Sequence, residues 1–417
     1  MKARLELSRA KHRSLSGHPR IAQVVASWVP FYEYGEARIF KADRAPDDVV
    51  AQRRADFARL SDLYRRRFPE TMRVTAEATG LISDLQFTEA YRVPFQFSSY
   101  VRRHLPVGAF LQSSSGVTTT DLDGNSYYDL TGSYGVNLFG YDFYKECIDS
   151  AIEHVRALGP VLGSYHPVVA ENAARLVHLS GMDEVSFHMS GTEAVMQAVR
   201  LARYHTRRTH LVRFCGAYHG WWGDVQPGIG NPAPAHDTYT LTDMSEASLR
   251  VLGSRPDIAC VLVNPVQVMH PNNAAPADST LVGSNTTPMR PDRAAYADWL
   301  KRLRDAGLPV QVANLSSIWT ICYTRPSAYN WMFQYYLRAE GVALSWVGTG
   351  RLIFSLNYTE ADFAAVADRL VAAAEAMRRG GWWWEDPLAS NRKIKRKVLR
   401  EMVSHRLSLQ RARRAPG

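Results

Sequence analysis

The 417-residue sequence is poor in cysteine and in lysine, and it has no long apolar run. Its four cysteines lie far apart, with no C-x-x-C pair and no zinc-like His/Cys spacing, so we expect no metal site and reduced core thiols in a cytoplasmic protein. No stretch approaches the roughly 18 apolar residues of a spanning helix. The basic N-terminus also lacks the apolar segment of a secretory signal. We therefore expect no membrane partner.

The composition is that of an ordinary globular protein, with 46% hydrophobic and 22% charged residues, and the length suggests two or three domains. The net charge is +10, but its distribution is uneven. The last 27 residues contain ten basic residues and one acid, Glu401, and so carry +9. This tail either forms a solvated helix or contacts acidic partners. It lacks interleaved aromatics, and no nucleic-acid-binding fold is evident, so we expect no nucleic-acid partner.

Residues 1–95 form an Arg-rich N-terminal extension without a catalytic motif. Apolar residues in 47–68 recur with helical spacing, which predicts a helix there. The extension is either a packed accessory helical layer or a docking or dimer-lining segment. After it, two alternating stretches flank Asp123-Gly124-Asn125, a strong signal for a β-hairpin turn.

Residues 141–307 alternate between helical and strand patterns, which indicates a parallel α/β sheet. We expect helices at 145–158, 167–179 and 294–306, and strands at 184–187, 209–214 and 258–263. The last strand is almost continuously apolar, which is typical of a strand buried on both faces. A further helix follows Thr192. Its core-facing stripe should contain Val195, Ala198, Val199 and Ala202.

The pattern changes again after Gly307. Strands are expected at 310–313, 318–323 and 352–356, with a helix near 331–340. A second helix at 359–377 should begin with a variant capping box, Thr359-x-x-Asp362.

Two short motifs in the α/β region have the chemistry of a ligand site. Ser190-Gly191-Thr192 stands between a predicted strand and helix, where backbone amides and hydroxyls bind phosphate well, although Ser and Thr also serve there as purely structural caps. Tyr218-His219-Gly220 follows the next strand, and strand ends of α/β sheets are where ligands bind. Tyr218 offers a ring for stacking and Gly220 permits close approach, but a packed turn would need the same residues.

Taken in order, several segments resemble the class III pyridoxal-phosphate (PLP) aminotransferases, in their glutamate-1-semialdehyde aminomutase-like branch. The segments are DLDGNSYYDL, FHMSGTEAVMQAVRLARYHT, FCGAYHGWW and VLVNPVQ. The stretch YHGWWGDVQPG, followed by IACVLVNPVQVMHPN, is similar to aminotransferase units of polyketide and nonribosomal peptide assembly lines. The resemblance covers roughly residues 100–306 and 308–385.

The resemblance implies an α/β fold of the fold type I PLP-dependent transferase kind. Its parts would be the helical extension 1–95, a small α+β domain built from 96–140 and 308–385, a truncated parallel-sheet large domain 141–307, and the basic tail 386–417. The implied activity is transfer of an amino group to a keto or aldehyde substrate, either a small molecule or one bound to a carrier protein in secondary metabolism. The implied assembly is a homodimer or a dimer with a full-length relative.

The resemblance also assigns roles to individual residues. Ser190, Gly191 and Thr192 would hold the cofactor phosphate, and Tyr218 would stack on the pyridine ring with His219 beside it. Arg351 would lie near a substrate carboxylate. Two further cofactor-site positions fall at Asn264 and Gln267, and Asn264 stands where many relatives carry Glu.

The expected catalytic centre is missing from the sequence. PLP chemistry needs a lysine for the cofactor's aldehyde and an acid partner for the pyridine nitrogen. None of the eight lysines follows a core strand in a Gly-rich turn; they are Lys2, Lys11, Lys41, Lys145, Lys301, Lys393, Lys395 and Lys397. We therefore assign no catalytic residue, and we expect PLP to bind non-covalently at best.

A segment of the family's large domain is missing between DRAAYADWLKRLRDAG and LPVQVANLSSIW. In the family, the segments that these two resemble flank about three βα units, which amount to on the order of a hundred residues. The gap is either a natural loss or the product of an incomplete gene sequence. The chain is then either an impaired aminotransferase or a non-catalytic paralogue that acts as a partner or regulator of a full-length one.

Overall fold

The computed structural model describes residues 32–161, 163–214, 217–225, 237–241, 246–263, 307, 309–315, 318–345, 352–386 and 389–414. The described chain divides into two compact units. Unit 1 comprises residues 147–263, and unit 2 comprises residues 32–146 together with 307–414. Each unit is described by itself.

Unit 2 begins with the helical extension. The predicted helix at 47–68 is confirmed as α4 (Asp47–Arg67), and four more helices accompany it: α3 (Glu36–Ile39), α5 (Pro69–Thr79), α6 (Ser83–Tyr91) and α7 (Phe95–His104). Phe57 and Tyr64 of α4 lie in the same hydrophobic cluster as Trp319 and Trp382 from the C-terminal part of the chain. The described part of the extension, residues 32–95, is therefore a packed layer that shares one core with residues such as Trp319 and Trp382.

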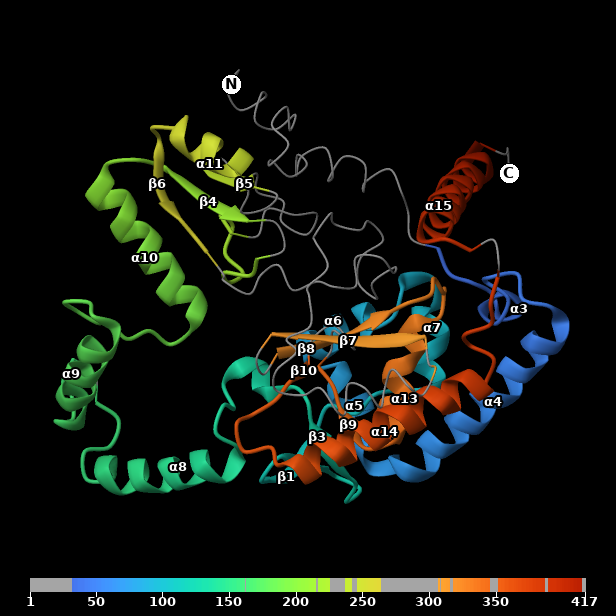
Figure 1. Ribbon diagram of the computed structural model, residues 1–417, viewed down its shortest axis with the longest axis horizontal. Helices are drawn as coiled ribbons and strands as arrows, with labels where there is room; N and C mark the ends of the chain where they lie inside the picture. The colour runs from blue at the N-terminus through green and yellow to red at the C-terminus, as the bar shows by residue number, and fades with distance from the viewer. Residues whose placement is uncertain are drawn as a thin grey trace. The chain divides into compact units, whose positions relative to one another are not determined.

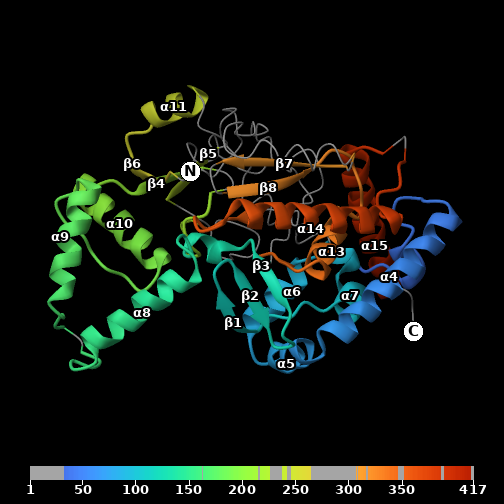
Figure 2. The ribbon, with the colours of Figure 1, turned by 60° about the horizontal axis from the view of Figure 1, so that its bottom comes forward.

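The predicted hairpin is present in unit 2. β1 (Leu111–Ser115), β2 (Thr118–Asp121) and β3 (Ser126–Asp129) are antiparallel neighbours, as Figure 2 shows. Gly124 at the turn has φ +79°, a conformation that suits glycine. β3 also pairs in parallel with β9 (Val342–Ala343), which joins the segment before residue 140 to the C-terminal segment in one sheet.

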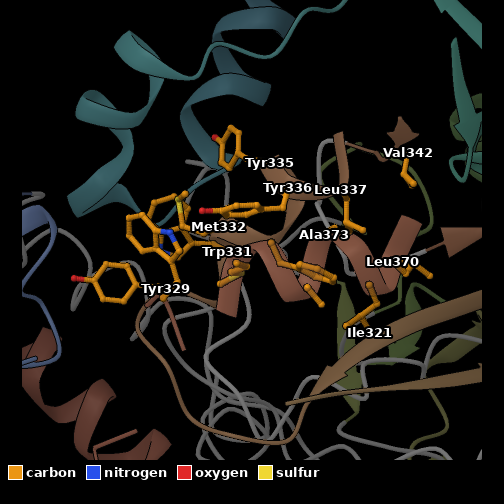
Figure 3. Packing of buried hydrophobic residues seen from close by; sticks show 14 of the residues in the cluster. Ile321, Tyr329, Trp331, Met332, Tyr335, Tyr336, Leu337, Val342, Leu370 and Ala373 are labelled. Atoms are coloured by element: carbon orange, nitrogen blue, oxygen red, sulfur yellow. The ribbon is translucent and has the colours of Figure 1, made fainter. Parts of the chain in front are cut away.

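A second sheet of unit 2 has the order β10-β8-β7, with antiparallel pairs. Its strands are β7 (Val310–Leu315), β8 (Ile318–Tyr323) and β10 (Leu352–Ile353), so all three predicted strands exist and the last is shorter than expected. The predicted helix near 331–340 is a 3-10 turn (Asn330–Met332) followed by α13 (Phe333–Ala339). Figure 3 shows the residues of these elements packed together, among them Trp331, Met332 and Leu337 with Ile321 and Leu370.

The predicted helix after residue 359 is α14 (Glu360–Arg379), and its capping box is complete. The Thr359 hydroxyl accepts a hydrogen bond from the Asp362 amide at 3.2 Å, and the Asp362 carboxylate accepts one from the Thr359 amide at 2.9 Å. The helix begins there because these two bonds satisfy backbone donors that the helix itself leaves open.

Replacing this cap should measurably destabilise unit 2. We expect Thr359→Ala to lower the free energy of unfolding by about 1 kcal/mol, since the hydroxyl acceptor is lost. Thr359→Ser keeps the acceptor and should remain within a few tenths of a kcal/mol of the wild type. Urea unfolding followed by circular dichroism measures both; equal losses in the two variants would contradict the role of the cap.

Unit 1 contains a three-stranded parallel sheet with helices. The sheet has the order β5-β4-β6, with β4 (His210–Phe214) between β5 (Thr238–Leu241) and β6 (Ile258–Val261). The helices are the end of α8 (Tyr141–Val155), α9 (Val168–Ser180), α10 (Gly191–Thr206) and α11 (Glu246–Gly253). α10 packs beside β6. This arrangement confirms the predicted parallel α/β region and the helices expected at 145–158 and 167–179.

Some local expectations for unit 1 are wrong. Residues 184–187 form no strand, because they have no neighbouring strand among the described residues and Phe187 is 59% exposed. The strand at 258–263 ends at Val261 and is not buried on both faces; Val263 beyond it is 52% exposed, since β6 is an edge of the described sheet. On α10, Val199 is buried but Ala198 is exposed.

The expectation that the cysteines are core thiols is wrong for two of the four, Cys147 and Cys260. Cys147 is exposed and Cys260 is half-buried, and both are free thiols. The side chains of Cys215 and Cys322 and the helix predicted at 294–306 lie outside the described residues. Within the described part of the chain, no helix is long and apolar enough to cross a bilayer, and no cluster of side chains is suited to hold a metal ion.

Candidate phosphate-binding site

The N-terminus of α10 presents backbone amides from a well-defined cap. Ser190 is extended and its hydroxyl accepts a hydrogen bond from the Glu193 amide at 3.2 Å. The Glu193 carboxylate in turn accepts a hydrogen bond from the Met189 amide at 3.0 Å. Among the described residues, nothing accepts a hydrogen bond from the amides of Gly191 and Thr192, which leaves two donors at the positive end of the helix.

The loop after β4 packs directly against this helix end. Gly220 is buried and has φ +98°, and a Cβ placed on it would lie 2.7 Å from Oγ1 and 3.0 Å from Cα of Thr192. Thr192 itself is only 7% exposed. The close approach therefore requires glycine at position 220, and it brings the two predicted motifs, 190–192 and 218–220, together at one place.

Tyr218 and His219 have different environments in this loop. Tyr218 is 60% exposed, so its ring is available for stacking. His219 is half-buried, and its Nε2 atom is enclosed without a hydrogen-bond partner among the described residues. Burial lowers the pKa of His219 below its ordinary value, and the charge of Arg213 adds to this effect. The lowered pKa favours the neutral imidazole form of His219. This side chain belongs to the loop that packs against the start of α10, where the two free amides lie.

The lowered pKa of His219 predicts a pH dependence of stability. The unfolded chain binds the His219 proton more readily than the folded chain, so stability is lost as the pH falls below 6.5. In His219→Gln we expect a smaller loss of unfolding free energy between about pH 7.5 and about pH 5.5 than in the wild type. His178→Gln, at an exposed position on α9, is the matched control and should keep the wild-type profile. Urea unfolding at each pH measures the difference, and parallel profiles for all three proteins would contradict it.

Two arginines hold this loop in position, and neither of them belongs to the motifs 190–192 and 218–220. Arg213 of β4 donates to the carbonyl of Val225. Arg203 of α10 forms an ion pair with Asp224 at 2.8 Å and donates to the Thr209 carbonyl at 2.7 Å. Arg213 lies within the strand predicted at 209–214, and this position was the available sequence signal for such a role. A charged side chain within a strand of a buried sheet needs a local partner.

The other predicted site residues are not brought to this place by the described chain. Asn264, Gln267 and Arg351 lie outside the described residues. Unit 1 contains no lysine between residues 147 and 263. The described lysines belong to unit 2, where Lys41 pairs with Asp47 at 2.5 Å and Lys145 donates to the Ser114 carbonyl.

The fold and this motif pair correspond to a known family. Residues 99–224 match the sequence model of the class III aminotransferases. Fold type I PLP transaminases have the same fold: a transaminase structure with PLP bound has a TM-score of 0.51 at 21% identity, covering 66% of this chain and 92% of that one. Residues 99–224 of this chain are therefore similar to class III aminotransferases, and the chain shares the fold of the fold type I transaminases.

Curated relatives of this chain include proteins named glutamate-1-semialdehyde 2,1-aminomutase. The protein from Haloquadratum walsbyi is 32% identical over 194 residues, covering 42% of each chain. The protein from Deinococcus radiodurans is 37% identical over 142 residues, 33% of this chain and 32% of that one. The matched region thus spans less than half of the relatives' length. A crystal structure of the aminomutase from Pseudomonas aeruginosa shares the fold, with a TM-score of 0.58 at 14% identity over 79% of this chain and 99% of that one.

The residues of unit 1 fit one part of PLP and not another. The two free amides of α10, the Ser190 and Thr192 hydroxyls and the close approach of Gly220 fit a phosphate group. The aldehyde of the cofactor would need a lysine, and residues 147–263 contain none. The site therefore supports phosphate binding and gives no basis for a covalent step.

Proposed function

We propose that the chain is a class III aminotransferase-like protein that binds PLP non-covalently and is catalytically impaired. The observation that carries the proposal is the contact of Gly220 with Thr192 at the N-terminus of α10. It places the 218–220 loop beside two free backbone donors, and the matching family model and the PLP-bound neighbour suggest the identity of the cofactor. When bound, PLP would supply an electron sink for chemistry at an amine carbon.

The chain's own residues would bind and orient the cofactor. The amides of Gly191 and Thr192 would hold the phosphate together with the two hydroxyls, and Tyr218 would stack on the ring. His219, held neutral, would lie beside the ring. By resemblance to the family, Asn264 and Gln267 would also belong to the cofactor site, and Arg351 would lie near a substrate carboxylate.

The proposed reaction and setting rest on the family. Intact relatives would transfer an amino group to a keto or aldehyde substrate, free or bound to a carrier protein, and we place this chain with them in secondary metabolism and in the cytoplasm. The proposed assembly is a homodimer or a dimer with a full-length relative. The missing lysine and pyridine-nitrogen acid are the reason for the proposed impairment.

Two measurements test the proposal. Equilibrium dialysis should show PLP binding that competes with inorganic phosphate, and incubation with amino donors and keto acceptors should show no amino transfer above the rate of free PLP. Absence of PLP binding would remove the cofactor claim. Amino transfer at a rate typical of enzymes would remove the claim of impairment.

A second candidate is a non-catalytic partner of a full-length aminotransferase. The exposed apolar residues of unit 1 favour it, among them Ile148 of α8 at 57%, Leu179 of α9 at 80% and Met189 at 94%. Size-exclusion chromatography with and without an intact relative tests the partner role, which requires a stable mixed complex. A mixed complex whose chain binds no PLP would favour this second candidate over the first.

A further inference from the structure

A groove of about 600 Å³ runs between the helix of the basic tail, α15 (Asn391–Arg414), and the segment 32–38 of unit 2. Figure 1 shows α15 next to α3, and Arg38 of α3 pairs with Glu401 of α15. One wall contains Tyr32, Tyr34 and Arg38. The other wall presents polar side chains of α15, and the volume is in the range of small-molecule sites.

The central carboxylate of the groove is already engaged. Glu401 accepts hydrogen bonds from the hydroxyls of Tyr32 at 2.6 Å and Tyr34 at 2.7 Å, in addition to the Arg38 ion pair. Burial raises the pKa of both phenols, and their hydrogen bonds to Glu401 add to the shift, so both remain donors. Glu401 therefore offsets the charge of Arg38, and the groove as a whole keeps more basic than acidic side chains.

The remaining charged groups of the groove are mostly positive. Arg400 is exposed on the groove wall and has no hydrogen-bond or ion-pair partner among the described residues. Lys397 lies 3.9 Å from Glu401, and its amine also donates to the carbonyl of Ala42. Burial lowers the pKa of this amine; Arg38 and Arg44 add to the effect, and the carboxylates of Glu401 and Asp43 oppose it. His405 also lines the groove, and Glu33 is an exposed acid at its rim. Partly desolvated cations that crowd one another are stabilised by an anion.

We propose that this groove binds a phosphate-bearing ligand, with Arg400 and Lys397 as its charged contacts and Ser404 as a hydroxyl donor. A phosphate has several acceptor oxygens and about two charges, which matches a groove lined by more than one cation better than a single carboxylate does. The phosphate belongs either to a soluble compound or to a lipid headgroup. This site is separate from the α10 site in sequence and in unit, so it does not rest on the proposed function.

The test uses the full chain and labelled pyrophosphate in equilibrium dialysis. The α10 site also accepts phosphate, so the groove is isolated in a Gly220→Val background, in which that site is blocked. There we expect Arg400→Gln to weaken pyrophosphate binding roughly tenfold or more, because a charge-assisted contact is removed. Arg392→Gln is the matched control: Arg392 is an exposed arginine of the same helix that does not line the groove, and its loss should change binding less than about twofold.

Flotation with vesicles distinguishes the two sources of phosphate. Vesicles of phosphatidylcholine with phosphatidic acid are compared with vesicles of phosphatidylcholine alone, for the wild type and Arg400→Gln. Binding of pyrophosphate without flotation supports a soluble ligand, and flotation that depends on phosphatidic acid and on Arg400 supports a lipid headgroup. Equal losses in Arg400→Gln and Arg392→Gln, or no binding of either probe, would overturn the proposal.

Discussion

Arg53→Met should lower the free energy of unfolding of unit 2 by about 3–5 kcal/mol. The Arg53 side chain is fully buried and forms a two-pronged ion pair with Asp43, with contacts of 2.8 and 2.6 Å. It also donates to the carbonyls of Phe40 and Gly381, and its guanidinium lies 4.5 Å from the ring centre of Tyr329. Removing it leaves the largely buried Asp43 carboxylate without its partner.

The neighbouring arginine supplies the control for this experiment. Arg54 is 40% exposed and lies 3.5 Å from Glu36, so Arg54→Met should change the unfolding free energy by no more than about 1 kcal/mol. A double variant, Arg53→Met with Asp43→Leu, should recover part of the loss, because the buried charge is then removed as well. Urea unfolding measures all three variants. Similar losses for Arg53→Met and Arg54→Met would show that the buried Arg53–Asp43 pair does not stabilise unit 2 more than an exposed pair does.

Gly220→Val should weaken PLP binding by at least about tenfold while leaving the β-sheet of unit 1 intact. A Cβ at this position would meet Thr192 at 2.7 Å, and φ +98° is strained for any L side chain, at a cost of about 1–3 kcal/mol. The loop must then move away from the start of α10, which separates the two motifs. Equilibrium dialysis with PLP measures the effect.

Gly253 supplies the control for Gly220. It ends α11, and nothing lies within 4 Å of a Cβ placed there, so Gly253→Ala should leave PLP binding unchanged. Far-ultraviolet circular dichroism checks that both variants remain folded. Wild-type affinity in folded Gly220→Val would contradict the phosphate site.

The sequence predicts well those elements whose signals are local. The capping box at Thr359, the turn at Gly124 and the periodicity of α4 each rest on neighbouring residues, and each is present. The strand expected at 184–187 failed for the opposite reason. A strand needs a partner, and apolar residues such as Phe187 cannot reveal whether one is there.

The candidate site was predictable in its parts but not in its contacts. The Ser190-Gly191-Thr192 and Tyr218-His219-Gly220 motifs both carry recognisable chemistry. That Gly220 touches Thr192 depends on how β4 and α10 pack, which is a tertiary property. The same is true of Arg203, whose partner Asp224 lies 21 residues away in sequence. The groove beside α15 joins residues more than 360 apart and had no sequence signal beyond the basic tail.

The central claim is that the chain binds PLP through its phosphate without a lysine bond. The most direct measurement is borohydride reduction of the PLP-treated protein, followed by intact-mass determination and peptide mapping. We expect PLP to be retained before reduction and the protein mass to be unchanged after reduction and denaturation. A stoichiometric mass increase mapped to one lysine, such as Lys145 or Lys301, would contradict the claim and would show that this chain supplies a lysine for covalent PLP binding.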